Sequence, residues 1–223
     1  MGGRCTSWVG WFVTSVGENV SSPAWTVKLA SEDEDPSTVQ AIYEVFLDAM
    51  GRLDRGDSGW IYRRLAESDA LALCRDADGA LVGYGFYLCP KSFVNGSQLL
   101  WCNAVAIRKR WQNFGVVRGL DERVAQWLNV APRWLGCRTQ NPRVVAAYSD
   151  LGWCWPMDET FDTALGVQLL DLLRAHVPEV GLAVDLDPAT GVCRRVYQGG
   201  RLGDSSSLAH RPHVDRLLAN IEL

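Results

Sequence analysis

The sequence has few of the residues that most often build metal sites or disulfide frameworks. Its 223 residues include three histidines and seven cysteines, an odd number, and no C-x-x-C pair occurs. This pattern argues against a disulfide framework and against a zinc site, so no metal is expected. Free thiols inside apolar runs behave as small hydrophobes and persist in reducing compartments, which predicts a cytoplasmic protein.

Long apolar runs and an excess of positive charge are absent as well. No run reaches the roughly 18 apolar residues of a membrane span, and the apolar segment 8–16 lacks a convincing signal-peptide cleavage site, so no membrane association is expected. The net charge of −4 provides no electrostatic footprint for nucleic acid. With 48% hydrophobic residues, the composition is that of a soluble globular protein.

Strand-like and helix-like segments alternate along the chain. Apolar residues recur at helical spacing after Asp35-Pro36, a helix-start signal, and two strand-like runs flank a turn sequence at 76–79. The predicted order is strand 25–30, helices 35–50 and 58–66, strands 70–75, 81–89 and 99–107, helix 115–128, strand 134–138 and helix 141–151. The remainder predicts a helix at 162–175, a hairpin at 182–196 and a last amphipathic helix ending near Ile221.

One motif lies between the strand 99–107 and the helix that follows it. Residues 112–117 read Gln-Asn-Phe-Gly-Val-Val, after a basic turn at 108–110. Backbone amides at a helix start lack acceptors within the helix, the helix dipole favours an anion there, and glycine lets a phosphate approach closely. The loop is therefore a candidate pyrophosphate site. The alternative interpretation is a plain strand–loop–helix connection.

A second motif lies in the predicted helix 141–151. Asn141 begins the helix ahead of a proline, and Tyr148 follows seven residues later, about two helical turns, so both side chains share one face. The segment ends in Leu151-Gly152-Trp153. The alternative interpretation is a helix-capping asparagine and a half-buried core tyrosine.

Together the two motifs resemble the cofactor-binding motifs of the GCN5-related N-acetyltransferase (GNAT) superfamily. The family pattern at the loop is Gln or Arg, two residues, Gly, one residue, then Gly or Ala. Gln112 and Gly115 match this pattern, whereas Val117 stands where a small residue is usual. The resemblance implies an α/β fold with a mixed, mostly antiparallel central sheet flanked by helices and a C-terminal α/β extension.

The resemblance also implies a division of the chain. Residues 1–24 would form an N-terminal arm, 25–156 an acyl-CoA-binding core, and 157–223 a C-terminal extension packed on the same domain. Three roles stay open for that extension: completing the sheet, covering the acceptor site, or contacting a second copy in a homodimer.

The function implied by the resemblance is transfer of an acetyl group from acetyl-CoA to a primary amine of a small molecule by direct attack. Tyr148 would be the general acid that protonates the leaving thiolate. No cysteine has an adjacent histidine base, which argues against an acyl-enzyme. The donor-binding residues would be Ala106, Ile107, Gln112, Asn113, Phe114, Gly115, Val116, Val117 and Asn141.

The strand 99–107 lacks the Glu, Asp or His with which many family members deprotonate the amine. Cys102 or Asn103 can hold a water there, but neither is a good base. Carboxylates elsewhere are candidate bases, although each is also interpreted as a solvated surface charge; they are Glu44, Asp48, Asp54 and Asp57.

Two further hypotheses keep the fold and change the function. Val117 and a group of tryptophans favour a donor with a longer acyl chain, carried on coenzyme A or on a carrier protein. The tryptophans also have a simpler interpretation as core residues; they are Trp101, Trp111, Trp127, Trp134, Trp153 and Trp155. The absent strand carboxylate favours a non-catalytic acyl-CoA sensor or scaffold.

Overall fold

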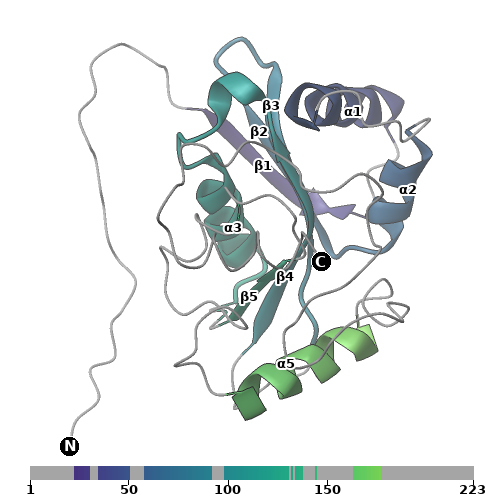
Figure 1. Cartoon of the computed structure of the whole chain (residues 1–223). Coiled ribbons are helices and arrows are strands. Elements are labelled where there is room, and N and C mark those ends of the chain that lie inside the picture. Colours follow the sequence, from purple (N-terminus) through teal and green to yellow (C-terminus); the bar gives the residue numbers. More distant parts are fainter. Residues whose placement is uncertain are drawn as a thin grey trace, which may run out of the picture.

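The computed structural model describes residues 23–30, 35–50, 58–91, 98–130, 132, 134–137, 144 and 163–176, and the structural statements below concern these residues. Five strands form one sheet in the order β1-β2-β3-β4-β5 (Figure 1). The strands are β1 (Ala24–Leu29), β2 (Ala70–Arg75), β3 (Leu81–Leu88), β4 (Leu99–Ile107) and β5 (Trp134–Cys137). The helices are α1 (Pro36–Met50), α2 (Gly59–Ala66), α3 (Val116–Trp127) and α5 (Thr163–His176), with a 3-10 turn, η2 (Lys109–Trp111).

The sheet is mixed and mostly antiparallel, as the resemblance implied. Strands β1 to β4 pair antiparallel in chain order, and β5 pairs parallel to β4. The bounds predicted for β2 and β4 are the observed ones, and α1 begins at the predicted proline. Of the predicted extension, α5 is described, while the hairpin 182–196 and the last helix lie outside the described residues. Of the predicted helix 141–151, only residue 144 is described, and it is helical.

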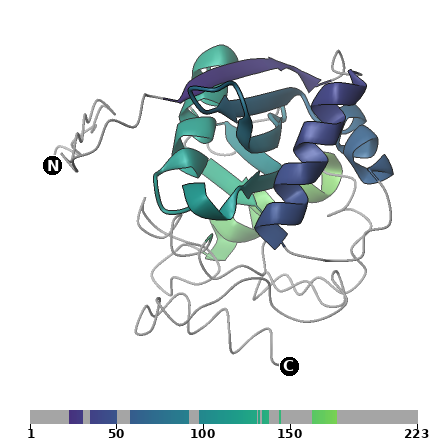
Figure 2. The same cartoon turned by 90° about the horizontal axis from the view of Figure 1, so that it is seen from above.

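Helices cover both faces of the sheet (Figure 2). On one face α1 and α2 pack over β2, β3 and β4, where Ile42, Phe46 and Ile61 are buried. On the other face α3 contributes Val116, Leu120 and Val124 to a second buried cluster. Helix α5 packs on the tryptophans of β4 and β5. In the part of the chain that the structure describes, no helix is long and apolar enough to span a membrane.

Helix α1 begins where Asp35 caps its free amides. The Asp35 carboxylate accepts hydrogen bonds from the backbone amides of Ser37 and Thr38 at 3.2 Å each, and from both hydroxyls. These bonds, with the side chain of Ser37 first, lower the pKa of Asp35 to about 2. A side-chain cap of this kind orients the first turn of a helix.

Helix α3 is attached to the sheet by a buried tyrosine–aspartate pair. The Tyr87 hydroxyl of β3 donates to Oδ1 of Asp121 at 2.7 Å, and both residues are buried. The Tyr87 ring lies over Gly85, where an added Cβ would come within 2.5 Å of the ring. Glycine at 85 therefore lets the ring reach the helix that follows the candidate phosphate loop.

The substitution Tyr87→Phe is expected to lower the free energy of unfolding by about 1–3 kcal/mol, because Asp121 loses a donor while it stays buried. Urea denaturation measures this change. Tyr62, which is 43% exposed on α2, is the control, and its replacement by Phe should change stability by less than about 0.5 kcal/mol. Equal stability of the two variants would contradict the structural role of the pair.

Candidate functional site

Strand β4 has a bulge near its middle. Phe86 of β3 lies opposite Ala104 and Tyr87 lies opposite Cys102, so Asn103 is the extra residue. The bulge breaks the alternation of side chains, because Asn103 and Ala104 both face α1 and α2. The pairing of β4 with β5 runs from Leu99 to Cys102. Among the described residues, β4 beyond the bulge pairs with β3 alone.

The loop after β4 is anchored to the end of that strand. The Gln112 side chain donates from Nε2 to the carbonyl of Ile107 at 3.0 Å. Asn113 and Gly115 then adopt left-handed backbone conformations, with φ of 70° and 73°. Left-handed residues next to right-handed ones turn successive amides toward one side, an arrangement that binds anions. Gln112, which matches the family pattern, thus shapes the loop through a contact with the backbone.

The start of α3 leaves amides available for a ligand. Gly115 is the N-cap residue, and no side chain caps the helix there. The amide of Gly119 donates to the carbonyl of Gly115 at 2.9 Å, so the amides of Val116, Val117 and Arg118 lie in the first turn without helix acceptors. A Cβ at Gly115 would meet no described atom within 4 Å, so the described part of the chain leaves space beside this residue. We call residues 113–118 the amide cradle.

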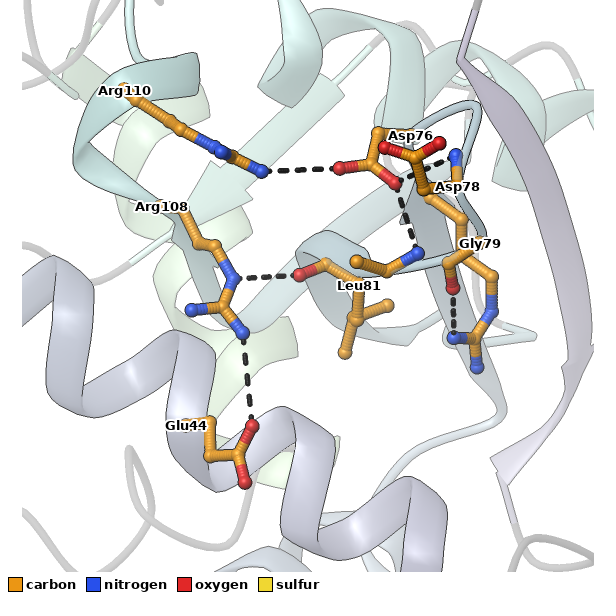
Figure 3. A network of polar contacts seen from close by, with 9 residues as sticks. Glu44, Asp76, Asp78, Gly79, Leu81, Arg108 and Arg110 are labelled. Atoms are coloured by element: carbon orange, nitrogen blue, oxygen red, sulfur yellow. Dashed lines mark hydrogen bonds and ion pairs between the residues drawn. The ribbon is translucent and has the colours of Figure 1, made fainter.

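The basic side chains before the cradle are held by groups of the protein itself (Figure 3). Arg108 donates from Nε to the carbonyl of Leu81 at 2.8 Å and lies 3.8 Å from Glu44 of α1. Arg110 pairs with Asp76 of the β2–β3 turn at 3.1 Å. Both guanidinium groups have anionic partners, and an anion at the start of α3 would also be favoured by the backbone amides and the helix dipole.

Two of the candidate bases contact residues of the loop after β4. Glu44 faces Arg108, and Asp48 accepts a hydrogen bond from the backbone amide of Lys109 at 2.7 Å. Asp54 and Asp57 lie outside the described residues, and so do Asn141 and Tyr148. The roles predicted for these four residues therefore stay predictions.

A polar cluster at the bulge was not predicted from the sequence. Arg64 of α2 is 7% exposed and donates from Nη1 to Glu67 and to Oδ1 of Asn103, at 3.1 Å in each case. The Asn103 amide donates to the Ser68 hydroxyl at 3.2 Å. Arg64 follows Ile61 by three positions, which places a charge on the apolar face of α2. A charged residue on the apolar face of a helix is the feature of the sequence that could have predicted this buried polar cluster.

Val117, the departure from the family pattern, packs against the buried cluster between α3 and the sheet. Its side chain is part of the contact that attaches the helix. Replacing Val117 by Ala is expected to lower the free energy of unfolding by about 1 kcal/mol, because less apolar surface is buried. Urea denaturation measures this change, and parent-like stability of the variant would contradict the packing role of Val117.

Two cysteine thiols have raised pKa values, which makes them less reactive as nucleophiles. Burial, with a smaller contribution from the charge of Asp76, raises the pKa of Cys74 to about 11. Burial and the charge of Asp69 also raise the pKa of Cys89. Because the thiolate is the reactive form, both groups are poor nucleophiles at neutral pH. Among the described residues no group of three or more His, Cys, Asp or Glu side chains is placed to hold a metal ion.

Trp153 and Trp155 lie outside the described residues, and the other four tryptophans of the group do not form one wall. Trp101 packs on Leu170 of α5, and Trp134 packs on Leu169 of the same helix. Trp111 makes an edge-to-face contact with Phe114, a 72% exposed residue of the cradle, and Trp127 is 42% exposed. This distribution agrees with the interpretation of Trp101 and Trp134 as core residues.

Comparisons with known proteins find similar solved structures but no similar sequence. No protein-family model and no curated protein matches the sequence. Similar solved structures include an aminoglycoside acetyltransferase from an uncultured soil metagenomic sample, with 18% identity, a TM-score of 0.47, and coverage of 63% of this chain and 97% of that one. The ribosomal-protein-alanine N-acetyltransferase of Brucella melitensis biovar Abortus 2308 has 11% identity, a TM-score of 0.47, and coverage of 63% and 98%.

A third similar structure is the aminoglycoside N-acetyltransferase AAC(6')-Iy in complex with CoA, with 14% identity, a TM-score of 0.44, and coverage of 63% and 95%. All three identities lie below 25% and all three TM-scores below 0.5, so these structures are similar to this chain and assign it neither a family nor an activity.

Proposed function

We propose that this protein is an N-acyltransferase that moves an acetyl group from acetyl-CoA to a primary amine of a small molecule by direct attack. The observation that carries the proposal is the amide cradle, residues 113–118, at the end of the bulged strand β4. Two left-handed residues, an uncapped helix start and the space that the described part of the chain leaves beside Gly115 fit an anionic group such as a pyrophosphate.

The rest of the donor would extend from the cradle along β4. Pantetheine contains two amide groups, and these can pair with backbone groups at a strand edge. Among the described residues, β4 beyond the bulge pairs with β3 alone, and we propose that the segment ending at Ala106 and Ile107 binds pantetheine along its other edge, where the carbonyl of Ile107 already accepts from Gln112. Asn141 is proposed to contact the pantetheine arm as well. This arrangement would bring the thioester near the bulge at Asn103.

The reaction is proposed to proceed without a covalent enzyme intermediate. The amine nitrogen attacks the thioester carbonyl, a carbon–nitrogen bond forms, and the carbon–sulfur bond breaks as the tetrahedral intermediate collapses. Tyr148 donates its phenolic proton to the departing thiolate. The raised pKa values of Cys74 and Cys89 give no support to an acyl-enzyme on either thiol.

The amine is proposed to arrive from the α2 side of the bulge. There Glu67, Ser68 and Asn103 supply oxygen atoms next to a buried guanidinium. An amine that enters neutral, or that loses its proton to water, needs no carboxylate on β4. The C-terminal extension is proposed to border this side, since α5 packs on Trp101 of the same strand.

Calorimetric titration of the purified chain with acetyl-CoA tests the proposal, followed by a screen of small-molecule amines for release of free thiol. A Kd of about micromolar order and amine-dependent thiol release would support it. Saturable binding of a long-chain acyl-CoA or an acyl carrier protein, without binding of acetyl-CoA, would favour the longer donor. Binding of acetyl-CoA without turnover of any amine would favour the sensor.

A further inference from the structure

Asp48 of α1 lies on the opposite layer of the protein from α3, yet it contacts the loop that leads to α3. Its Oδ2 accepts the backbone amide proton of Lys109 at 2.7 Å, across 61 positions of sequence. Lys109 is the first residue of the 3-10 turn η2, and first-turn amides have no acceptors within their own turn. Asp48 therefore caps η2 from a distant helix.

The turn that Asp48 caps ends at the amide cradle. The amide of Trp111 donates to the carbonyl of Arg108 at 2.8 Å, and the amide of Gln112 donates to the carbonyl of Lys109 at 3.3 Å. The cradle begins with the next residue, Asn113, in its left-handed conformation. A shift of η2 would consequently displace the amides that face the ligand.

We propose that Asp48 is a positioning residue for donor binding, which holds the amide cradle in its binding geometry through the amide of Lys109. The inference rests on the proposed function, because the ligand of the cradle is the acetyl-CoA pyrophosphate. It assigns to Asp48 a role that differs from that of a base, since its carboxylate is engaged by a backbone amide on the donor side.

The charge of Asp48 and its hydrogen bond have opposite effects on an anionic ligand. A carboxylate near the cradle repels a pyrophosphate, so removal of the charge alone should tighten binding. Loss of the acceptor releases Lys109 and should weaken binding. Asp48→Asn removes the charge and retains an oxygen acceptor, whereas Asp48→Ala removes both. The two variants therefore separate positioning from electrostatics.

The experiment measures the Kd for acetyl-CoA by calorimetry, and KM and kcat with a turned-over amine, for the parent and both variants. Asp48→Ala is expected to raise Kd and KM by about 10-fold, the upper range for the loss of one hydrogen bond, with kcat unchanged at saturation. Asp48→Asn is expected to bind as tightly as the parent or tighter. Asp171→Ala is the control, because it removes a 65% exposed carboxylate of α5 that pairs with Arg174 of the same helix, and it should leave the Kd for acetyl-CoA unchanged.

The possible results are distinct. An Asp48→Ala variant that binds like the parent, or that loses kcat with KM unchanged, would overturn the positioning role. Equal weakening by Ala and Asn would overturn it as well, because the acceptor would then be irrelevant. If the parent itself fails to bind acetyl-CoA, the proposed function fails and this role fails with it, whereas binding by the parent leaves the result specific to Asp48.

Discussion

Replacing Tyr148 by Phe is expected to lower kcat by about 100-fold or more, because proton donation by a general acid contributes about 10²–10⁴-fold to the rate. The Kd for acetyl-CoA should stay unchanged, since Phe keeps the ring and removes only the hydroxyl. The fall in kcat is expected because the departing thiolate needs a proton as the carbon–sulfur bond breaks. Steady-state kinetics with a saturating amine and calorimetry with acetyl-CoA measure the two quantities.

Two controls make this prediction specific to the leaving group. Tyr62→Phe removes a hydroxyl from an exposed tyrosine of α2 and should leave kcat unchanged. An acetyl thioester of a more acidic thiol should reduce the difference between the parent and Tyr148→Phe, because a better leaving group needs less protonation. Parent-like turnover by Tyr148→Phe would show that the phenol is not the acid.

Replacing Gly115 by Asp is expected to raise the Kd for acetyl-CoA by about 100-fold, because a carboxylate would stand at the helix start beside the pyrophosphate. Two unit charges about 6 Å apart repel by about 2.8 kcal/mol at the effective dielectric of a protein surface, which corresponds to about 100-fold in Kd. The left-handed φ of 73° at Gly115 is one that Asp and Asn tolerate. Calorimetry measures the affinity, and thermal unfolding measures the stability of the same variant.

Gly115→Asn is the matched control, since Asn has the shape of Asp without the charge. Both residues enter the left-handed region more readily than other L residues and carry a similar strain there, and Asp also interacts favourably with the helix dipole. The Gly115→Asp variant is thus expected to be at least as stable as the Gly115→Asn variant and to bind acetyl-CoA much more weakly. Similar affinities of the two variants would place the anion away from this helix start and contradict the cradle.

Local patterns predicted much of the fold. Periodic apolar residues predicted the bounds of β2 and β4 and the proline start of α1, because each pattern reflects burial of one face of its own element. The glycine at 115 predicted a helix start that approaches a ligand closely, and its positive φ agrees with that reading. The predictions at Asn141 and Tyr148 concern residues outside those that the structure describes.

Other parts of the site could not be read from local patterns. A bulge at Asn103 depends on how β3 and β4 pair, and strict alternation along β4 would have placed Asn103 and Ala104 on opposite faces. From the sequence alone, Arg64 has the pattern of a surface charge, and only the packing of α2 over the bulge shows that it is buried. From the sequence alone, Val117 departs from the loop pattern, and only the structure shows its contact with the buried cluster of α3.

The sequence by itself determined the order of the elements and the loop that forms the amide cradle, because both follow from residues close together in the chain. The tertiary structure decided which side chains serve that loop. Asp48 and Lys109 are 61 positions apart, Arg64 and Asn103 are 39 apart, and Tyr87 and Asp121 are 34 apart. Contacts over such separations depend on sheet register and on the packing of helices across both faces, which no local pattern encodes.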